Sequence, residues 1–266
     1  MIFTDEALEL APWSISKAKT SIQCPWKFEK QYIEKLRIPP EETHDISDRS
    51  LRVGSAVHKY AEEIAKKADP EKAKNLAISD NHLVSDEIEE FEAMIDNVHH
   101  LEDRISKFKT KHTVTKDLIE FKLGVNSDLT PADFWDRGVF FRGVIDRTLL
   151  VNDVHAVMID IKSSKFPTLK YSQQQLAAYS LMMFCVFPKL EMVHPALYFV
   201  PSGRLLWGDK IWKSKIELNE DYSTVAYIND AASRARSDEI VPGKYCSWCV
   251  YKNICLVERK TRREKA

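Results

Sequence analysis

The segment AVMIDIKSSK places an acidic and a basic residue close together in a sequence typical of a β-strand. Because side chains alternate along a strand, Asp160 and Lys162 are expected to share one face. Val157, Ile159 and Ile161 would form the opposite, apolar face. The charged pair could be a cross-strand ion pair, or it could serve metal-assisted hydrolysis. In the second interpretation Asp160 holds a divalent cation, and Lys162 orients a hydroxide and stabilises the developing negative charge.

A second carboxylate precedes this segment in FRGVIDRTLL, where Asp146 interrupts another alternating strand. Asn152 and Asp153 form a turn signal, which predicts an antiparallel hairpin. In that hairpin Asp146 and Asp160 would lie at the same level, because each is six or seven residues from the turn. Two carboxylates this close repel each other unless a cation lies between them, and their oxygen ligands suit Mg²⁺ or Mn²⁺. Gly143 would leave room for a close approach of backbone or ligand.

The elements that must position these residues change in character along the chain. In the segment 54–67, Val57, Tyr60, Ala61 and Ile64 form an apolar stripe at helical spacing. The middle of the chain is rich in β-branched and aromatic residues with period-two alternation. The order of elements predicts a mixed α/β (α+β) fold with a central mixed β-sheet flanked by helices. The expected helices are two short ones within 13–36, then 54–67, 84–108, 172–187 and 221–236; the expected strands are 113–125, 139–151, 154–161, 192–200 and 205–212, and 38–50 is expected to be a loop.

Four of the five cysteines form a second constellation. Cys246, Cys249 and Cys255 are spaced C-x2-C-x5-C, and Cys24 lies alone near the other end of the chain. Three thiolates from one loop and one from a distant segment make a closed set of four ligands, which suits a [4Fe–4S] cluster or a structural zinc ion. Zinc sites more usually use two matched pairs, so the arrangement favours the cluster. Cys185, in the apolar run LMMFCVF, is expected to be a buried hydrophobic residue.

Composition restricts the classes of protein to which the chain can belong. It has 266 residues, 39 Lys and Arg against 40 Asp and Glu, a formal net charge of −1, and 44% hydrophobic residues. These values exclude a disordered, collagen-like or coiled-coil protein. No apolar run reaches the ~18 residues of a membrane span, and the first residues, MIFTDEALEL, are acidic, unlike a signal peptide. We therefore expect a cytoplasmic protein without a membrane partner.

Four short motifs follow one another in an order found in a known group of nucleases. They are G-x-x-x-H at 54–58, G-x-x-D at 143–146, D-x-K at 160–162 and Q-x-x-x-Y at 175–179. With them the chain resembles the RecB-like branch of the PD-(D/E)XK nuclease superfamily, which implies a restriction-endonuclease-like core. The resemblance further implies metal-binding roles for His58, Asp146, Asp160 and the carbonyl of Ile161, a catalytic role for Lys162, and support of the site and the DNA strand by Gln175 and Tyr179. Glu120, in the strand before the hairpin, is not assigned to the site.

The cysteines extend this resemblance to AddB-type and CRISPR-associated iron–sulfur exonucleases, which place one cysteine before the nuclease core and three after it. Segments 14–37 and 240–258 would then pair as the cluster-binding subregion of a single nuclease domain spanning 1–266. Segment 38–110 would be a helical insertion that carries the G-x-x-x-H motif. A cluster would join the two ends of the chain, so that ligand binding stabilises both.

The activity implied is that of a Mg²⁺- or Mn²⁺-dependent deoxyribonuclease, an exonuclease acting on DNA ends with single strands as the expected substrate. It would serve recombination, repair, phage DNA processing or CRISPR adaptation in a bacterial, archaeal or phage-infected host cell. A helicase or recombinase is a candidate partner, and an oligomer is a candidate state. Two alternatives stay open: a catalytically silent DNA-binding or assembly subunit that keeps the fold, and a nuclease in which zinc replaces iron.

A net charge near zero means that DNA would require a local basic lane rather than a wholly basic surface. The candidate phosphate contacts fall near the first cysteine, around the proposed site and in the C-terminal tail. They are Lys27, Lys30, Lys35, Arg37, Arg142, Arg147, Lys165, Lys170, Arg259, Lys260, Arg262, Arg263 and Lys265.

Overall fold

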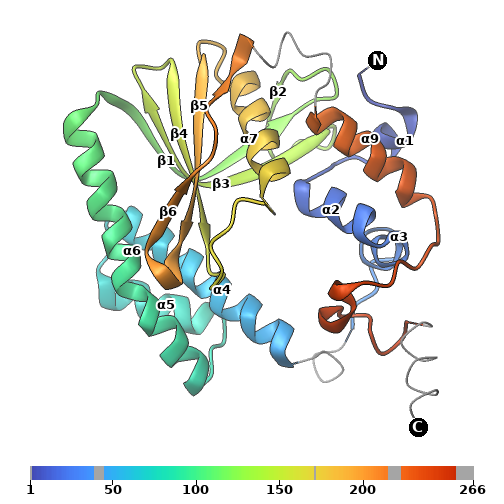
Figure 1. Ribbon diagram of the computed structural model, residues 1–266, viewed down its shortest axis with the longest axis horizontal. Coiled ribbons are helices and arrows are strands. Elements are labelled where there is room, and N and C mark those ends of the chain that lie inside the picture. The colour runs from blue at the N-terminus through green and yellow to red at the C-terminus, as the bar shows by residue number, and fades with distance from the viewer. Residues whose placement is uncertain (1, 39–44, 171, 215–222, 256–266) are drawn as a thin grey trace.

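The computed structural model describes residues 2–38, 45–170, 172–214 and 223–255. Its centre is a β-sheet with helices on both faces (Figure 1), so the predicted fold class is confirmed. The helices are α1 (Asp5–Glu9), α2 (Ile15–Gln23), α3 (Pro25–Phe28), the π-helix η1 (Glu29–Ile33), α4 (Asp45–Ala65), α5 (Pro70–Asp80), α6 (Ser85–Lys111), α7 (Gln173–Val186), the 3-10 helix η3 (Val200–Ser202), α9 (Ser223–Ala235) and the 3-10 helix η4 (Lys244–Trp248). The strands are β1 (Val114–Val125), β2 (Pro131–Ala132), β3 (Phe141–Val151), β4 (His155–Lys162), β5 (Met192–Phe199), β6 (Arg204–Trp207) and β7 (Ile211–Trp212).

The strands form a seven-stranded mixed sheet in the order β2-β1-β3-β4-β5-β6, with β7 also pairing with β5. Only the β4–β5 pair is parallel among the strand pairs of the described residues. Parallel neighbours need a crossover connection, and α7 supplies it. The chain therefore leaves the carboxyl end of β4 and enters α7 directly beside it.

The predicted hairpin joins β3 to β4. Asn152 and Asp153 both have left-handed backbones, with φ of 52° and 62°, as the tightest hairpin turns require. Pairing runs from Val151 opposite His155 to Arg147 opposite Ile159, so the next residues in this register are Asp146 and Asp160. The prediction that these two carboxylates lie at the same level is confirmed.

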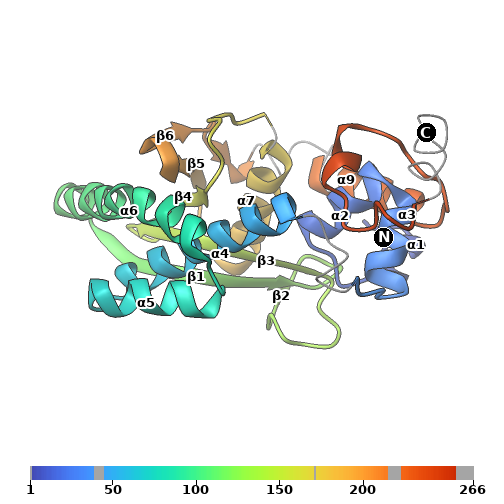
Figure 2. The same ribbon diagram turned by 90° about the horizontal axis from the view of Figure 1, so that it is seen from below.

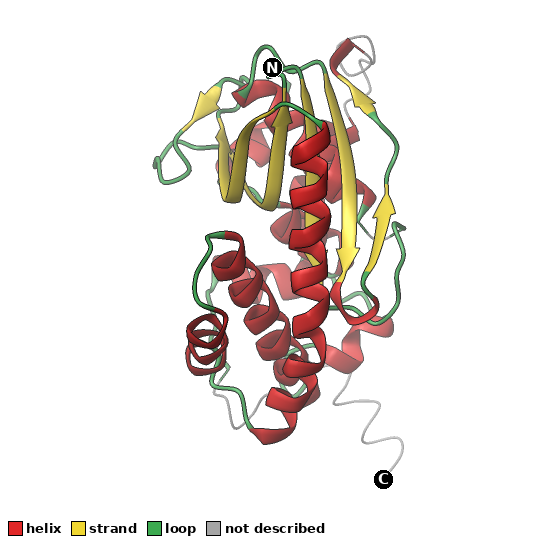
Figure 3. Cartoon of the chain, turned by 90° about the vertical axis from the view of Figure 1, so that its left-hand side faces the viewer, coloured by secondary structure: helices red, strands yellow, loops and turns green. Residues whose placement is uncertain are grey.

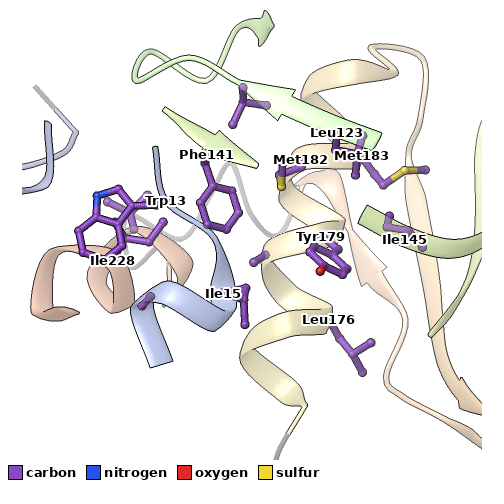
Figure 4. Close-up of a cluster of buried hydrophobic side chains, with 14 of the residues drawn as sticks. Trp13, Ile15, Leu123, Phe141, Ile145, Leu176, Tyr179, Met182, Met183 and Ile228 are labelled. Carbon is purple, nitrogen blue, oxygen red and sulfur yellow. The ribbon is translucent and has the colours of Figure 1, made fainter. Parts of the chain in front are cut away.

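Two hydrophobic cores lie on the two faces of the sheet. On one face α7, α9 and the N-terminal helices cover residues such as Leu123 and Ile145 (Figure 4). On the other face, helices α4 and α6 pack against the sheet, and Val157, Ile159 and Ile161 point into their core. The strand faces predicted for β4 are thus correct, and β4 is buried on both sides.

The N-terminal helices and the described segment that follows α9 lie side by side (Figure 2). The backbone N–H of Trp26 donates to the carbonyl of Glu239 at 3.1 Å, and the hydroxyl of Tyr251 donates to the carbonyl of Leu36 at 3.0 Å. The rings of Trp26 and Tyr251 meet edge to face, with their centroids 6.2 Å apart. Residues that follow α9 are therefore held against those around α3.

The structure corrects the predicted elements of the helical layer, in which the long helix α6 lies across the sheet (Figure 3). Residues 45–50, expected in a loop, form the first turns of α4; residues 39–44 lie outside the described part of the chain. Arg49 on these added turns pairs with Asp86 and Glu90 of α6, which favours the helical extension. α5 was not predicted either, although Asp69 caps it and Pro70 occupies its first turn.

The strand expected over 205–212 is two strands. β6 pairs with β5 through Ala196 opposite Trp207, whereas β7 pairs through Val193 opposite Ile211, so the register shifts by one residue between them. Pro195 lies inside β5 and has no N–H to donate, while its carbonyl accepts from the N–H of Gly208 at 2.9 Å. A proline in an inner strand is a usual cause of such an interruption.

Candidate metal and catalytic site

Three elements converge at the carboxyl end of β4. That end of the strand carries Asp160 and Lys162, and α7, the next helix in the chain, carries Gln175. From the opposite face of the sheet, α4 contributes His58. The neighbouring strand β3 contributes Asp146. Side chains from four separate sequence motifs are thereby brought within contact distance of one another.

Gln175 bridges the two charged residues of β4. Its amide nitrogen Nε2 donates to Oδ1 of Asp160 at 2.7 Å, and its Oε1 accepts from Lys162 Nζ at 3.2 Å. The ammonium of Lys162 also forms an ion pair with Oδ2 of Asp160. Asp160 is only 4% exposed. Burial raises the pKa of its carboxyl group above the ordinary value, while the charge of Lys162 opposes this shift.

Asp146 links β4, which carries Asp160 and Lys162, to α4 on the other face of the sheet. Its Oδ2 accepts from the backbone N–H of Ile161 at 2.5 Å, and its Oδ1 lies 3.1 Å from Nδ1 of His58. Burial lowers the pKa of His58, but the hydrogen bond to Asp146 and the surrounding carboxylates outweigh it, so the pKa is raised. The imidazole is 36% exposed and can be reached from solvent. A ligand role for the carbonyl of Ile161 stays a prediction.

Glu120 of β1 also lies at the site, and no motif identified it. One ligand atom from each of His58, Glu120 and Asp146 lies within 4.8 Å of the other two. The register of β1 and β3 explains this, because Ile119 faces Arg147 and Phe121 faces Ile145, which leaves Glu120 opposite Asp146. A search for carboxylates paired across the strands would have found it.

The alternation of side chains changes at this level of the sheet. Ile145 lies in the core on the α7 side, yet Leu149, four residues further along β3, lies in the core on the α6 side. Strict alternation would place them on the same face. On the adjacent strand Glu120 has a left-handed backbone, with φ of 48°, which is uncommon for residues other than glycine. Such backbone strain occurs preferentially at functional sites.

The donor set suits a hard divalent cation. Burial and the nearby Asp146 raise the pKa of Glu120 to about 7, although His58 opposes this shift. Two carboxylates crowded beside an imidazole are the oxygen and nitrogen ligands that Mg²⁺ and Mn²⁺ accept. Asp160 lies behind this group, held by Lys162 and Gln175, and is not within the 4.8 Å cluster.

The site opens to solvent through a hollow of about 460 Å³. Its lining includes His58, Glu120 and Glu62, the last one turn beyond His58 on α4. Glu62 contacts Lys59 at 3.4 Å and also pairs with Lys66, and these two lysines lower its pKa against the effect of burial. Glu62 is therefore part of the surface of the hollow and not of the metal-binding cluster.

Two motif glycines allow helices to approach the strands closely. A Cβ on Gly54 would lie 2.9 Å from Oγ of Ser163, directly after β4. A Cβ on Gly143 would lie 2.6 Å from the ring of Tyr179, too close for any side chain. Tyr179 projects from α7 into the core (Figure 4), and burial raises the pKa of its hydroxyl to about 12, partly opposed by its hydrogen bond to Gln175. The absence of a side chain at Gly143 therefore lets α7, which carries Gln175, pack closely against β3.

The four predicted ligand cysteines line one pocket of about 270 Å³. Cys24 lies between α2 and α3, and the other three follow α9. Burial raises the pKa of the Cys249 thiol, with smaller contributions from Cys24 and Cys246 nearby. Within the described residues, no three of these sulfur atoms lie within 4.8 Å of one another. Cys185 packs against the α7-side core, away from this pocket.

The predicted phosphate contacts differ in their accessibility. Arg147 is only 3% exposed and pairs with Asp117 and Glu102, so its assignment as a DNA contact is wrong. Lys165 pairs with Glu90 at 3.1 Å. The basic residues from position 259 onwards lie outside the described part of the chain.

A mixed sheet whose adjacent strands present carboxylates and a lysine beside a helix-borne histidine defines a nuclease core. The chain belongs to the PD-(D/E)XK nuclease superfamily, whose family model matches residues 12–256. That match includes all four motifs and all five cysteines. In the structure, no described helix is long and apolar enough to cross a bilayer.

Comparison with individual proteins gives distant similarities. The crystal structure of SSO0001 has 16% sequence identity and a TM-score of 0.38, covering 88% of this chain and 95% of that one. A candidate exonuclease from Eubacterium rectale has 12% identity and a TM-score of 0.48, covering 96% of this chain and 90% of that one. Among curated proteins, none matches this sequence.

Proposed function

We propose that this protein is a divalent-metal-dependent deoxyribonuclease that removes nucleotides from DNA ends. The observation that carries the proposal is the continuous set of contacts from His58 through Asp146 to the backbone of Ile161, beside the Asp160–Lys162–Gln175 triangle. Contacts among four motifs distant in sequence are hard to explain as a fortuitous ion pair. They also count against a catalytically silent subunit, which would not need Lys162 at the end of β4.

The chain's own residues have separable roles in this reaction. His58, Asp146 and Glu120 would hold a cation, with Asp160 adjoining them. When bound, the cation supplies neutralising charge at the phosphate and lowers the pKa of water. Lys162 Nζ orients the attacking water and stabilises the negative charge that develops on the phosphate oxygens. Gln175 fixes the positions of both Lys162 and Asp160 by accepting from one and donating to the other.

The same proposal includes a [4Fe–4S] cluster held by the four cysteines. What supports this part of the proposal is that all four cysteines, from segments far apart in the sequence, line one pocket. The spacing of three thiolates in one loop and one in a distant segment favours a cluster over a zinc ion, which more usually has two matched pairs of ligands. The cluster would be structural, joining α3 to the segment after α9.

Digestion of end-labelled single- and double-stranded DNA with Mg²⁺ or Mn²⁺ tests the activity. The wild-type protein should shorten the labelled strand, and EDTA should stop the reaction. Lys162→Ala should lower the rate ~10²–10³-fold, the scale of losses when one transition-state charge partner is removed. Lys189→Ala, a charge removed from the opposite end of β5, should leave the rate unchanged.

Equal rates for Lys162→Ala and the wild type would overturn the site assignment. If the wild type binds DNA but cuts no substrate with either cation, the silent-subunit alternative is correct. Internal cuts in a circular single strand would replace the exonuclease assignment by an endonuclease.

A further inference from the structure

A second hollow adjoins the site on the α7 side of β3. It has a volume of about 570 Å³ and lies between the N-terminal segment, the beginning of β3 and α7. We call it the basic pocket and define it by Lys17, Tyr32, Lys35, Phe134, Arg142 and Tyr179. None of these residues is a predicted metal ligand, and Tyr179 belongs to the same motif and helix as Gln175.

The basic pocket has the opposite charge to the metal-binding hollow. Three of its lining residues are cationic, and among the described residues that line it none is acidic. The hollow at His58, in contrast, is lined by Glu62 and Glu120, and its lining cation, Lys59, is paired with Glu62 and Glu63. In a chain of net charge −1, three cations gathered around one cavity make a local site for an anion.

Two of the cations are fixed in place. The ammonium of Lys17 donates to the carbonyls of Leu10 at 2.5 Å and Pro12 at 3.2 Å, and lies 5.0 Å from the ring of Trp13. Burial, and to a lesser extent the charge of Lys35, lower its pKa to about 8. A cation held by carbonyls and aromatic rings without a carboxylate is one that an anion would stabilise.

Arg142 presents an unused donor. One of its terminal nitrogens donates to the carbonyl of Asp136 at 2.9 Å, and the guanidinium lies 5.6 Å from the ring centroid of Phe134. Its Nε is buried and, in the described part of the chain, has no hydrogen-bond partner. A buried donor without an acceptor is costly, and a phosphate oxygen is the acceptor that suits a guanidinium best.

The distance from the basic pocket to the metal site corresponds to a short step along a DNA strand. Val144 and Arg142 line the pocket, and they lie two and four residues before Asp146 on β3, about 7 and 13 Å away at the rise of a strand. A strand whose scissile phosphate lies at Asp146 would therefore reach the basic pocket with a nearby nucleotide.

Aromatic side chains surround the entrance. Phe134 lines the pocket, and the adjacent Trp135 is 68% exposed, with its ring centroid 4.8 Å from that of Phe134. Lys122 lies 5.0 Å from the centroid of Trp135. Exposed rings beside cations are the usual way in which proteins bind unpaired bases, whereas the bases of a duplex are already stacked on each other.

We propose that the basic pocket binds an unpaired nucleotide near the scissile phosphate, with its phosphate at Lys35 and Arg142 and its base against Phe134. This inference rests on the proposed nuclease function and adds a substrate class to it: a single strand, or a duplex end with unpaired nucleotides. A blunt duplex lacks the unpaired base and would not occupy the pocket.

Binding of a fluorescein-labelled oligothymidylate of about 20 nucleotides, measured by anisotropy in EDTA, tests the charge contacts. Lys35 is exposed, so Lys35→Glu should fold normally. It should weaken binding at least about ten-fold near 0.1 M salt and reduce the slope of log affinity against log salt by ~0.7 or more. Lys189→Glu, the same charge change at an exposed position beyond α7, should have no effect. Affinity for a blunt duplex should be unchanged in both variants.

The stacking contact has its own test. Phe134→Ala should weaken oligothymidylate binding about five-fold or more, but it should not affect binding of an abasic strand of the same length. Equal losses for Lys35→Glu and Lys189→Glu, or equal losses on single strand and blunt duplex, would overturn the pocket assignment. If the wild type cuts DNA while Lys35→Glu binds normally, only the pocket is wrong. If the wild type neither binds nor cuts any DNA, the nuclease proposal itself fails.

Discussion

Glu120 belongs to none of the four motifs, yet its carboxyl group affects both the charge of the site and its ability to bind a cation. It faces Asp146 across the β1–β3 pair and lies near His58, and its carboxyl group is partly buried. In the absence of a cation, the ionised form of Glu120 would repel Asp146. The protein therefore favours the protonated form, and cation binding must displace that proton.

This coupling predicts how stability depends on pH. Below about pH 4.5 Glu120 is protonated whether the chain is folded or unfolded. Between 4.5 and about 7 the unfolded chain releases the proton and the folded chain keeps it, so the free energy of unfolding falls as pH rises. In EDTA at pH 8, Glu120→Gln should therefore be more stable than the wild type by roughly 1–3 kcal/mol, and near pH 4 the two should be equal.

Urea denaturation at the two pH values measures this difference. Glu191→Gln, at an exposed position before β5, is the matched control and should follow the wild type. Mn²⁺ should raise the unfolding midpoint of the wild type at pH 8 more than that of Glu120→Gln, because only the wild type keeps the carboxylate ligand. A Glu120→Gln protein that is less stable than the wild type at pH 8 would contradict the argument.

Residue types near the site were largely predictable, and the exceptions have physical causes. Asp146, Asp160 and Lys162 stand out because charged residues interrupt apolar strands. Glu120 does not, because β1 is polar along much of its length. Its partial burial arises from the packing of α4 against β1, which cannot be read from the strand itself. Arg147 was misassigned for the converse reason: its ion partners Asp117 and Glu102 come from elements distant in sequence.

At the scale of elements, the position of α7 determines whether Gln175 can reach the end of β4. The helix lies as close to β3 as its side chains allow, with the ring of Tyr179 over Gly143. A methyl group at this glycine must displace the ring, and α7 with it. The effect on Gln175 is transmitted along the helix, since the two residues are one turn apart.

Gly143→Ala should therefore reduce both stability and activity. We expect a loss of about 1–3 kcal/mol in the free energy of unfolding, the usual cost of overpacking a core, and a lower cleavage rate. Gly138→Ala is the control, because a Cβ at that exposed glycine would meet no atom within 4 Å. Thermal unfolding and the end-labelled assay give the two readouts.

The steric cause can be isolated by combining substitutions. In a Tyr179→Ala background the obstructing ring is absent, so Gly143→Ala should cost less than it does in the wild type. Additive losses would mean that Gly143 acts through its backbone and not through the contact with Tyr179.

Elements with strong local signals were predicted well, and those decided by tertiary contacts were not. The β3–β4 hairpin has its turn residues and alternation in the sequence. The first turns of α4 depend on ion pairs from Arg49 to α6, and the division of the last strand depends on Pro195 in its neighbour. In both cases the residues responsible lie in another element, so the sequence of the affected segment does not predict the change. α5 is different, because its capping signal at Asp69 and Pro70 was present but lay in a polar stretch.

At the scale of the whole molecule, opposite charges are separated although the net charge is −1. Carboxylates gather at the hollow around His58, and cations gather at the basic pocket. The basic pocket is built partly from the N-terminal segment, through Lys17 and Lys35. Its geometry therefore depends on what holds the N-terminal helices in place, including their contacts with the segment after α9.

The cysteine pocket lies between the N-terminal helices and the segment after α9, so a group bound there would hold the two together. Cys24→Ser removes the only proposed ligand from the N-terminal half. In protein purified without oxygen, it should abolish the absorbance near ~400 nm expected of thiolate-bound iron. It should also lower the unfolding midpoint by roughly 2–4 °C for each kcal/mol of lost ligation. Cys185→Ser, at a half-buried thiol whose pKa burial raises to about 11, should keep both the absorbance and its iron.

The consequence should extend to DNA binding, because the same helices carry Lys17 and Lys35. Cys24→Ser should weaken binding of oligothymidylate more than Cys185→Ser does, even though neither cysteine lies in the basic pocket. Colourless wild-type protein with one zinc ion per chain would contradict the cluster but leave this coupling intact, since zinc would also join the two ends. Unchanged stability and DNA affinity in Cys24→Ser would contradict the coupling itself, because packing alone would then hold the N-terminal helices against the sheet.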